Sequence, residues 1–528
     1  MRAAAALLLA ALCGLAAIPA RADIAPKDIA SLESAGTLRD IAAGAYEHTL
    51  WNGNKRGDIV AALNALPPES ALRSLHDMKR RVLLSVSDAA RIKNDIAITP
   101  DNNLFILRLK KLQEMGLFED ALRLYTDTID TPRDARLAET GLTLMIHQRG
   151  LATACLEEKV LAPQFAGDEF FAMIDAVCSF ELGQADEPPS IELSPIIASV
   201  LADETRKYAA GDPAGLSAMT PLELAIVTSR GRIDYAVLDT TPAALRHYPA
   251  RVLASFLADR TLPQARVAPI QTEMARRGYV PARRLPSAKD AKQLSVDVNA
   301  LRKENKNAEA DALFWQAFQP LLAREPEIVA LTAYGPLLKD ADPQTLPADQ
   351  LRKAVAVLLA SGQELPAAWC ERFAAHGGAD APLVHIALRF VGACARNADK
   401  TVDKPEALLA RFPAESHGKL WVLLGLLAPK GPEGAEFLSV YEKHFPLTLP
   451  DDYVMPIEAG TGQSGGLSGF QGFGLPLLHV LGAVKGQAGD VLNRDGLQMT
   501  LKGLLDGGLD ADARQIAREV LVGILLTK

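Results

Sequence analysis

The fold of this chain is decided by Asn103-Leu-Phe-Ile-Leu-Arg-Leu-Lys-Lys-Leu-Gln-Glu-Met-Gly116, followed directly by Leu117-Phe-Glu-Asp-Ala-Leu-Arg-Leu-Tyr125. In both parts the apolar residues recur every three to four positions, which is the spacing of an amphipathic helix. A single glycine separates the two apolar stripes. The pattern therefore predicts two antiparallel helices that form one hairpin.

The residues between the stripes act as start and stop signals. Asp101 or Asn102 can cap the first helix just after Pro100. Gly116 can adopt the left-handed conformation that ends a helix. The second helix is expected to stop before Pro132.

The same residues resemble a tetratricopeptide repeat in order and spacing. The shared series consists of a bulky, a small and a bulky residue, a turn glycine, a small residue, an aromatic residue and a closing proline. In this chain these are Phe105, Leu109, Leu112, Gly116, Ala121, Tyr125 and Pro132. The match departs at Arg108, which occupies a usual apolar position, at Leu109, which occupies a usual small one, and at the proline, which comes one residue early. Residues Asn307 to Phe318 look like the second half of another repeat. The resemblance implies an all-α, tetratricopeptide-like α-solenoid of helix hairpins that offers a binding surface and no catalytic residue.

A second hairpin carries a cysteine on each arm. Leu151 to Leu161 forms one predicted arm, Pro163 to Asp168 the turn and Glu169 to Leu182 the other arm. Residues equally far from the turn face each other in an antiparallel pair, and the midpoint of Cys155 and Cys178, about 166, lies in this turn. The two sulfur atoms are therefore expected to meet.

Cys370 and Cys394 stand in a similar context, with Trp369 to Phe373 as one predicted arm, His376 to Ala381 as the turn and Pro382 to Ala395 as the other arm. The two pairs have nearly equal sequence separations, 23 and 24. Four cysteines allow three pairings, and the local pairing suits both hairpins. Four buried free thiols are the alternative, and the chain has no CxxC or CxH spacing for a metal. Each disulfide would contribute roughly 3 kcal/mol in the chain-entropy model.

The first 22 residues have the three parts of a secretory signal. Arg2 supplies the positive charge, residues 3–17 form an apolar run and Ala20-Arg21-Ala22 is a cleavage site, so the mature chain is expected to begin at Asp23. A membrane anchor is the alternative, but the run is shorter than the ~20 residues of a span. The signal predicts a periplasmic protein without a transmembrane segment after cleavage.

Composition favours a helical, ordered protein. Apolar residues make up 49% of the chain, charged residues 23% and aromatic residues only 5%, which favours close helix packing. The net charge of −8 over 528 residues does not favour binding to nucleic acid or to an anionic membrane surface. Three basic runs are expected to lie in solvent: Lys79-Arg80-Arg81, Arg276-Arg277 and Arg283-Arg284.

Breaks in the helical pattern predict seven segments. They are a signal peptide (1–22), an N-terminal helical cap (23–100), the tetratricopeptide-like hairpins (101–183), a polar linker (184–195), further helical repeats (196–446), a glycine-rich loop (447–474) and a C-terminal helical cap (475–528). Within 196–446, Thr-Pro pairs such as Thr220-Pro221 predict capped short helices.

The glycine-rich loop holds Leu467, Phe470 and Phe473 among its glycines, and we expect these side chains to contact a partner. Residues 462–466 match a nucleophile elbow, but no strand before them or partner triad after them supports catalysis. Glu33-Ser34 resembles the catalytic Glu-Ser of lytic transglycosylases, yet the surrounding motif and the lysozyme-like domain of that family are missing.

These observations predict a non-catalytic periplasmic scaffold that binds a protein or peptide and needs no cofactor or metal. The alternative hypothesis is a cell-wall or polysaccharide-processing enzyme, or the helical accessory subunit of one. Association with the cell envelope is compatible with both.

Overall fold

The computed structural model describes residues 32–70, 72–184, 193–202, 205–324, 327–343, 346–395, 404–429, 432–445, 473–483 and 492–527. Within these ranges almost all of the regular secondary structure is helical, so the all-α prediction is confirmed. The signal peptide, most of the linker and most of the glycine-rich loop lie outside the described residues.

The α-helices are α3 (Arg56–Ala65), α4 (Arg73–Leu84), α5 (Leu104–Glu114), α6 (Phe118–Thr126), α7 (Ala135–Arg149), α8 (Leu151–Leu161), α9 (Glu169–Glu181), α10 (Pro195–Ala202), α11 (Pro213–Ala218), α12 (Pro221–Ser229), α13 (Pro242–Leu245), α14 (Ala250–Ala258), α15 (Gln264–Arg276), α16 (Pro286–Lys303), α17 (Asn307–Arg324), α18 (Ile328–Leu331), α19 (Gly335–Lys339), α20 (Ala348–Ala360), α21 (Ala367–His376), α22 (Ala381–Phe390), α23 (Pro405–Arg411), α24 (Ala414–Leu426), α25 (Pro432–His444), α26 (Gly474–Ala483), α27 (Arg494–Asp506) and α28 (Asp510–Leu526). Two strands, β1 (Tyr208–Ala209) and β2 (Ile233–Asp234), form a short parallel pair. Short 3-10 turns include η4 (Ala162–Phe165), η5 (Tyr235–Val237) and η7 (Thr332–Tyr334).

The hairpin α5–α6 forms where the apolar spacing predicts it. Its cap differs from the prediction: Asn103, not Asp101 or Asn102, accepts hydrogen bonds from the first amides of α5, because Pro100 to Asn102 form a 3-10 turn before it. Gly116 has a φ of 77°. A Cβ atom there would also lie 2.9 Å from the backbone of Arg251 on α14, so both conformation and space require glycine.

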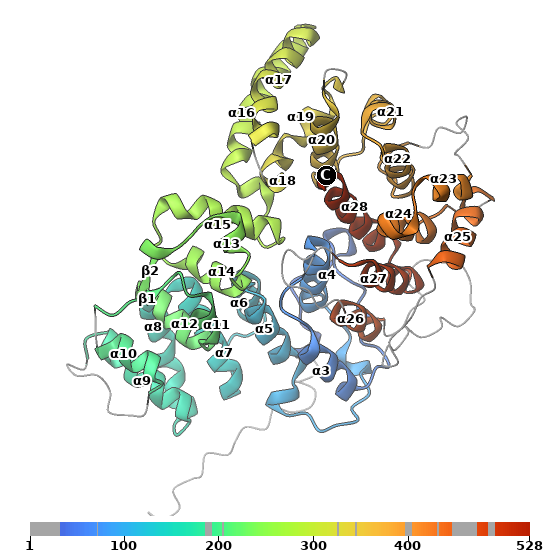
Figure 1. Ribbon diagram of the computed structural model, residues 1–528. Helices are drawn as coiled ribbons and strands as arrows, with labels where there is room; N and C mark the ends of the chain where they lie inside the picture. Colours follow the sequence, from blue (N-terminus) through green and yellow to red (C-terminus); the bar gives the residue numbers. More distant parts are fainter. Residues whose placement is uncertain are drawn as a thin grey trace, which may run out of the picture.

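The path of the chain brings its two ends together. Figure 1 shows successive helices running outward through α12, around through α15 to α20, and back, so that α26–α28 lie beside α3 and α4 at the centre. Helix α26 packs against α3, and α28 packs against both α4 and α20. The two predicted caps are therefore in contact. Caps at opposite ends of an open solenoid would not touch, so the solenoid prediction is not confirmed.

Several helices lack a side-chain cap of their own and receive one from a remote segment. Glu519 of α28 accepts hydrogen bonds from the Arg73 and Ser74 amides at the start of α4, at 2.6 and 2.8 Å. Glu69 accepts one from the Ala250 amide at the start of α14, at 2.6 Å. An acidic side chain at a helix N-terminus pairs free amides and complements the helix dipole. These contacts tie distant parts of the chain together.

Basic side chains serve the opposite helix ends. Arg514 and Arg518 of α28 donate to the carbonyls of Phe390, Val391 and Gly392 at the end of α22. Arg277 donates to the carbonyls of Leu245 and Tyr248 after α13. Cations are favourable at helix C-termini. Carboxylates at helix N-termini and basic side chains at helix C-termini thus connect segments that lie far apart in the sequence.

The expectation of solvated basic runs is confirmed for Arg283 and Arg284, which are exposed, and is wrong for Lys79 and Arg277. Lys79 is 1% exposed and donates to the carbonyls of Pro67 and Glu69. Arg277 is 4% exposed and pairs with Glu273. Sequence spacing cannot distinguish a surface arginine from one that binds the carbonyls of a remote helix end, because the partner is set by tertiary packing.

Candidate functional site

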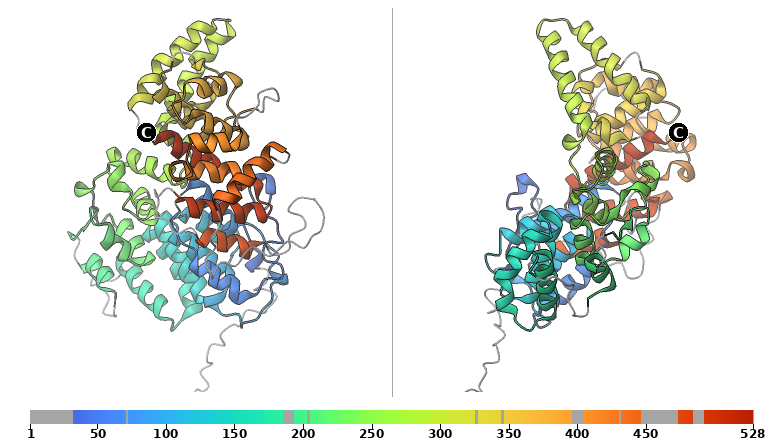
Figure 2. Two further views of the ribbon diagram at one scale, coloured as in Figure 1. Left: turned by 45° about the vertical axis from the view of Figure 1, so that its right-hand side comes forward. Right: turned by 90° about the vertical axis from the view of Figure 1, so that its left-hand side faces the viewer.

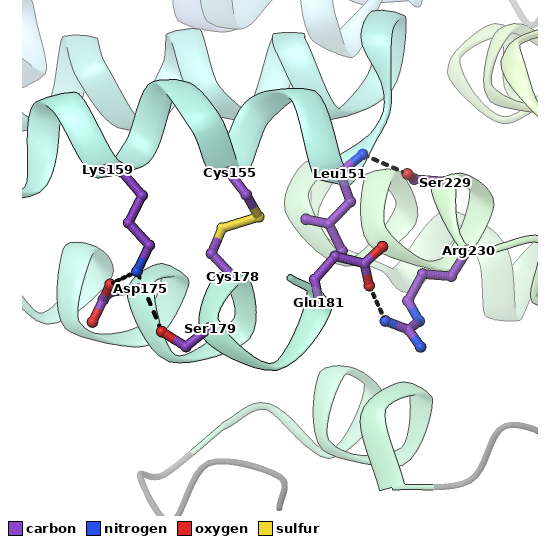
Figure 3. Close-up of a disulfide and its surroundings, with 9 residues drawn as sticks. All are labelled: Leu151, Cys155, Lys159, Asp175, Cys178, Ser179, Glu181, Ser229 and Arg230. Carbon is purple, nitrogen blue, oxygen red and sulfur yellow. Dashed lines mark hydrogen bonds and ion pairs between the residues drawn. A yellow bond between two sulfur atoms is a disulfide. The ribbon is translucent and has the colours of Figure 1, made fainter. Parts of the chain in front are cut away.

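The first cysteine pair forms a disulfide between two helices. Figure 3 shows the bond between Cys155 on α8 and Cys178 on α9. Their Cα atoms are 5.2 Å apart. Both side chains are fully buried. The arms match the predicted boundaries to within one residue, so the antiparallel register deduced from the sequence is confirmed.

Polar contacts flank this disulfide on both sides (Figure 3). Lys159 of α8 donates to Asp175 of α9 at 2.6 Å. At the other end, Ser229 of α12 accepts a hydrogen bond from the Leu151 amide at 2.7 Å, and Arg230 pairs with Glu181. The hairpin α8–α9 is thus connected to the next part of the chain through its open end.

The second cysteine pair is also a disulfide, but in a different setting. Cys370 lies on α21, whereas Cys394 lies beyond α22, where its backbone forms a bridge with Leu365. Their Cα atoms are 6.1 Å apart. The predicted pairing is confirmed. The predicted helical arm to Ala395 is wrong, because α22 ends at Phe390 and the chain turns at Gly392, where φ is 70°.

Of the three residues predicted to contact a partner, Phe473 can be placed. Its side chain is 6% exposed and meets the ring of Tyr46 edge-on, with 5.7 Å between the ring centroids. It packs inside the fold beside α26. Leu467 and Phe470, and the nucleophile-elbow pattern at 462–466, lie outside the described residues.

Glu33 has a structural role. Its carboxylate forms two 2.7 Å contacts with the Arg56 guanidinium, both side chains are 1% exposed, and it also accepts from the Leu104 amide. Arg108 donates to the Glu33 carbonyl, and burial lowers the pKa of Arg108 to about 10. A carboxylate held in this way cannot reach a substrate, so the transglycosylase-like dipeptide is not an active site.

An apolar pocket opens between the end of α24, α25 and α27. Its volume is about 510 Å³, and small or aliphatic residues such as Gly425, Ala435 and Leu505 line most of it. Its charged lining residues, Lys502 and Asp506, pair with each other at 3.0 Å. This lining offers van der Waals contacts and contains no nucleophile–base pair.

The hairpin α16–α17 is the most exposed helical unit of the described chain. Both views in Figure 2 show it projecting beyond the other helices. Over its 36 residues it buries only Ala291, Val298, Ala310, Phe314, Phe318 and Leu322. Val296 is 60% exposed and Leu321 is 37% exposed. We call this hairpin the arm.

The base of the arm is held by aromatic side chains. Phe318 stacks with Phe314 and meets Tyr334 of η7, with centroids 5.1 and 5.3 Å apart. Trp315 lies 6.5 Å from Trp369 of α21. The arm therefore projects from a rigid root. The sequence predicts the two helices. Their 3.6-residue pattern does not show how many other helices pack against them, so the exposure of the arm could not be predicted.

The described residues hold no cluster of three or more His, Cys, Asp or Glu side chains suited to a metal ion. Across the same residues no helix combines the length and apolar character needed to cross a membrane. No protein-family model, curated protein or solved structure matches the chain. The resemblance to tetratricopeptide repeats stays a prediction.

Proposed function

We propose that this protein is an exported helical scaffold that binds a protein partner through the arm and catalyses no reaction. The observation that carries the proposal is the arm itself. It is rooted by aromatic contacts and presents two helices with aliphatic side chains in solvent. Exposed apolar groups on a rigid projection are typical of protein-contact surfaces.

Export is supported by the two disulfides. Both are buried, and disulfides of this kind form and persist in oxidising compartments. The proposed compartment is the periplasm, with removal of residues 1–22. Intact-mass measurement of protein from a periplasmic fraction should give a mature chain beginning at Asp23. A mature chain that retains residues 1–22 would contradict this part of the proposal.

Partner binding is tested by site-specific photocrosslinking in cells. A photoreactive residue replaces Val296 on the arm or, as a control, Val237 of η5, which is similarly exposed at 56%. We expect one protein to be captured in near-stoichiometric yield from position 296 and not from 237. The same capture from both positions, or capture of glycan alone, would refute a protein scaffold that acts through the arm.

A matched pair of variants excludes non-specific capture. Val296→Asp with Leu321→Asp should abolish co-purification of the captured protein, because burying a carboxylate in an apolar contact is costly. Val237→Asp should leave co-purification unchanged. Far-UV circular dichroism and thermal unfolding should be the same for all three proteins, since each substituted side chain is exposed.

A further inference from the structure

Two buried histidines lie where α4 and α7 meet residues 221–279, the segment from α12 to the turn after α15, a contact that we call the seam. His76 of α4 is 1% exposed and stacks on Tyr279, which follows α15, with 3.8 Å between ring centroids. His147 of α7 is 4% exposed, and its Nε2 atom lies 3.1 Å from the carbonyl oxygen of Pro221 at the start of α12. Both histidines thus touch the same neighbouring segment.

The contacts of His147 favour the neutral ring. Its Nε2–H donates to the Pro221 carbonyl, and its ring stacks on Phe118 with 4.0 Å between centroids. Nδ1 is buried without a hydrogen-bond partner among the described residues. The pKa of His147 is lowered to about 3, chiefly by burial; the Pro221 bond opposes this shift and Arg251 of α14 adds to it.

His76 is held still more strongly in the neutral form. Both ring nitrogens are buried without a partner in the described chain. Burial lowers its pKa to about 3, and the nearby cations of α4 act in the same direction: Lys79, Arg80 and Arg73. The acidic groups around it are engaged elsewhere, with Asp120 of α6 on Arg80, Glu519 of α28 on the α4 amides, and Glu69 facing Tyr279 and Arg277.

We propose that the seam is an acid-sensitive joint, in which protonation of His76 and His147 separates α12–α15 from α4 and α7 while α20–α28 stay folded. The closed seam excludes the extra proton, whereas the open seam exposes both rings to water. Each histidine then favours the open form about tenfold per pH unit below ~6.5, until the pH reaches the value at which the closed form itself accepts a proton.

Helix α15 leads into the arm. Opening the seam would therefore alter how the arm is supported, although the joint does not depend on the arm binding a partner. A histidine joint of this kind responds within the pH range that an exported protein meets.

Other titrating groups at the seam determine the pH range in which the histidines can be tested. Glu223 of α12 and Glu273 of α15 have a lowered pKa because their hydrogen bonds and ion pairs outweigh burial, so both stay ionised at pH 5.0. Burial lowers the pKa of Lys79 to about 7, which makes stability rise with pH above 7. Burial raises the pKa of Asp77 of α4, so its protonation favours the closed form; a loss of protection between pH 6.5 and 5.0 therefore has the sign of the histidines and not of this carboxyl.

Hydrogen exchange on the full chain measures the joint. After correction for the intrinsic rate, we expect amides of α12–α15 to lose protection by at least tenfold between pH 6.5 and 5.0, and those of α20–α28 to change less than twofold. Unchanged protection in α12–α15, or an equal loss in both regions, would overturn the proposal.

Two variant proteins assign the effect to the two rings. His76→Phe with His147→Gln keeps the ring stack at one position and a donor at the other, and should make protection in α12–α15 independent of pH in this range. His247→Gln, at an exposed histidine between α13 and α14, should behave as the wild type. A double variant that keeps the wild-type pH dependence would refute the assignment. If the double variant does not fold, the wild-type exchange measurement still decides.

Discussion

The two disulfide-linked hairpins have nearly the same cysteine spacing and different surroundings. Their cysteines are 23 and 24 residues apart. Hairpin α8–α9 lies at an edge of the molecule, where Leu156 and Val160 on the outer face of α8 are each 65% exposed. Hairpin α21–α22 lies between α20, α24 and α28. The spacing of cysteines therefore specifies a pairing and not the structural context of that pairing.

The difference determines what each disulfide holds. At the edge, α9 is attached chiefly to α8 and η4, so the bond between Cys155 and Cys178 keeps a peripheral helix in place. In the interior, α22 contacts α24 and α28 independently of the bond. There the disulfide joins α21 to the chain segment that follows α22.

Removing each disulfide separately is expected to have the largest effect. Cys155→Ala with Cys178→Ala, and Cys370→Ala with Cys394→Ala, should each cost ~3 kcal/mol, because the closed loops are almost equal in length. Hydrogen exchange should show the first loss as local opening of α8–α9 and the second as weaker protection across α20–α28. Limited proteolysis should cut the turn at 162–168 only in the first variant.

Local opening of α21–α22 alone, with α20 and α28 unaffected, would contradict the comparison. The wild-type protein in a reducing agent serves as a further control for each variant. If reduction is complete, it should reproduce the sum of the two exchange patterns, since the hairpins are separate in space.

A glycine packed against a tyrosine ring, present on a helix next to each hairpin, gives the next largest effect. Gly141 of α7 lies against the ring of Tyr125, and Gly425 of α24 lies against Tyr441; a Cβ atom would come within 2.2 and 2.3 Å of these rings. Gly141→Ala and Gly425→Ala should each cost about 1–3 kcal/mol, because backbone or ring must move. Denaturant unfolding measures the loss.

Gly523 of α28 provides the matched control. Nothing lies within 4 Å of a Cβ atom at this position, so Gly523→Ala should stabilise the helix by up to about 1 kcal/mol. A loss of stability in the control, equal to that of the two test variants, would contradict the assignment of the loss to contact with the tyrosine rings.

What the sequence could predict follows from the range of each interaction. Hairpin register, helix ends and the local pairing of Cys155 with Cys178 depend on neighbours within about 30 residues, and local periodicity contains that information. The return of α28 to α4, where Glu519 caps the start of the helix, depends on a contact made over hundreds of residues. The exposure of the arm could not be predicted for the same reason. Its sequence indicates two helices but not how few other helices pack against them.

Each hairpin has a helix end that is capped by a side chain from a remote segment, and removing that side chain should have a smaller effect on stability. Ser229→Ala removes the cap on α8, and Arg514→Ala removes one donor to the end of α22. Each should cost about 1 kcal/mol, the usual value of a helix cap or a single hydrogen bond. Chemical denaturation measures this cost.

Arg123→Ala serves as a control, since its pair with Glu119 is exposed and should contribute under ~0.5 kcal/mol. A cost at Arg123 as large as at Arg514 would show that loss of charge, not of the cap, is responsible.

The smallest effect concerns an acid next to the edge disulfide. Glu158 of α8 is buried, and neither carboxylate oxygen has a hydrogen-bond partner among the described residues. Burial raises its pKa, the carboxylate of Asp175 raises it further, and Lys159 opposes both. The folded state thus favours the protonated acid. Stability is lost as the pH rises above the ordinary glutamate value of ~4.3.

Glu158→Gln should therefore stabilise hairpin α8–α9 near neutral pH, by under ~1 kcal/mol, and have no effect near pH 4. Glu157→Gln, at the neighbouring and partly exposed acid, is the matched control and should not change stability in this way. Thermal unfolding of both variants at pH 4 and 7 gives the comparison. A stabilisation that is equal at the two pH values would point to side-chain packing, and not to the charge of Glu158, as the source of the strain in the edge hairpin.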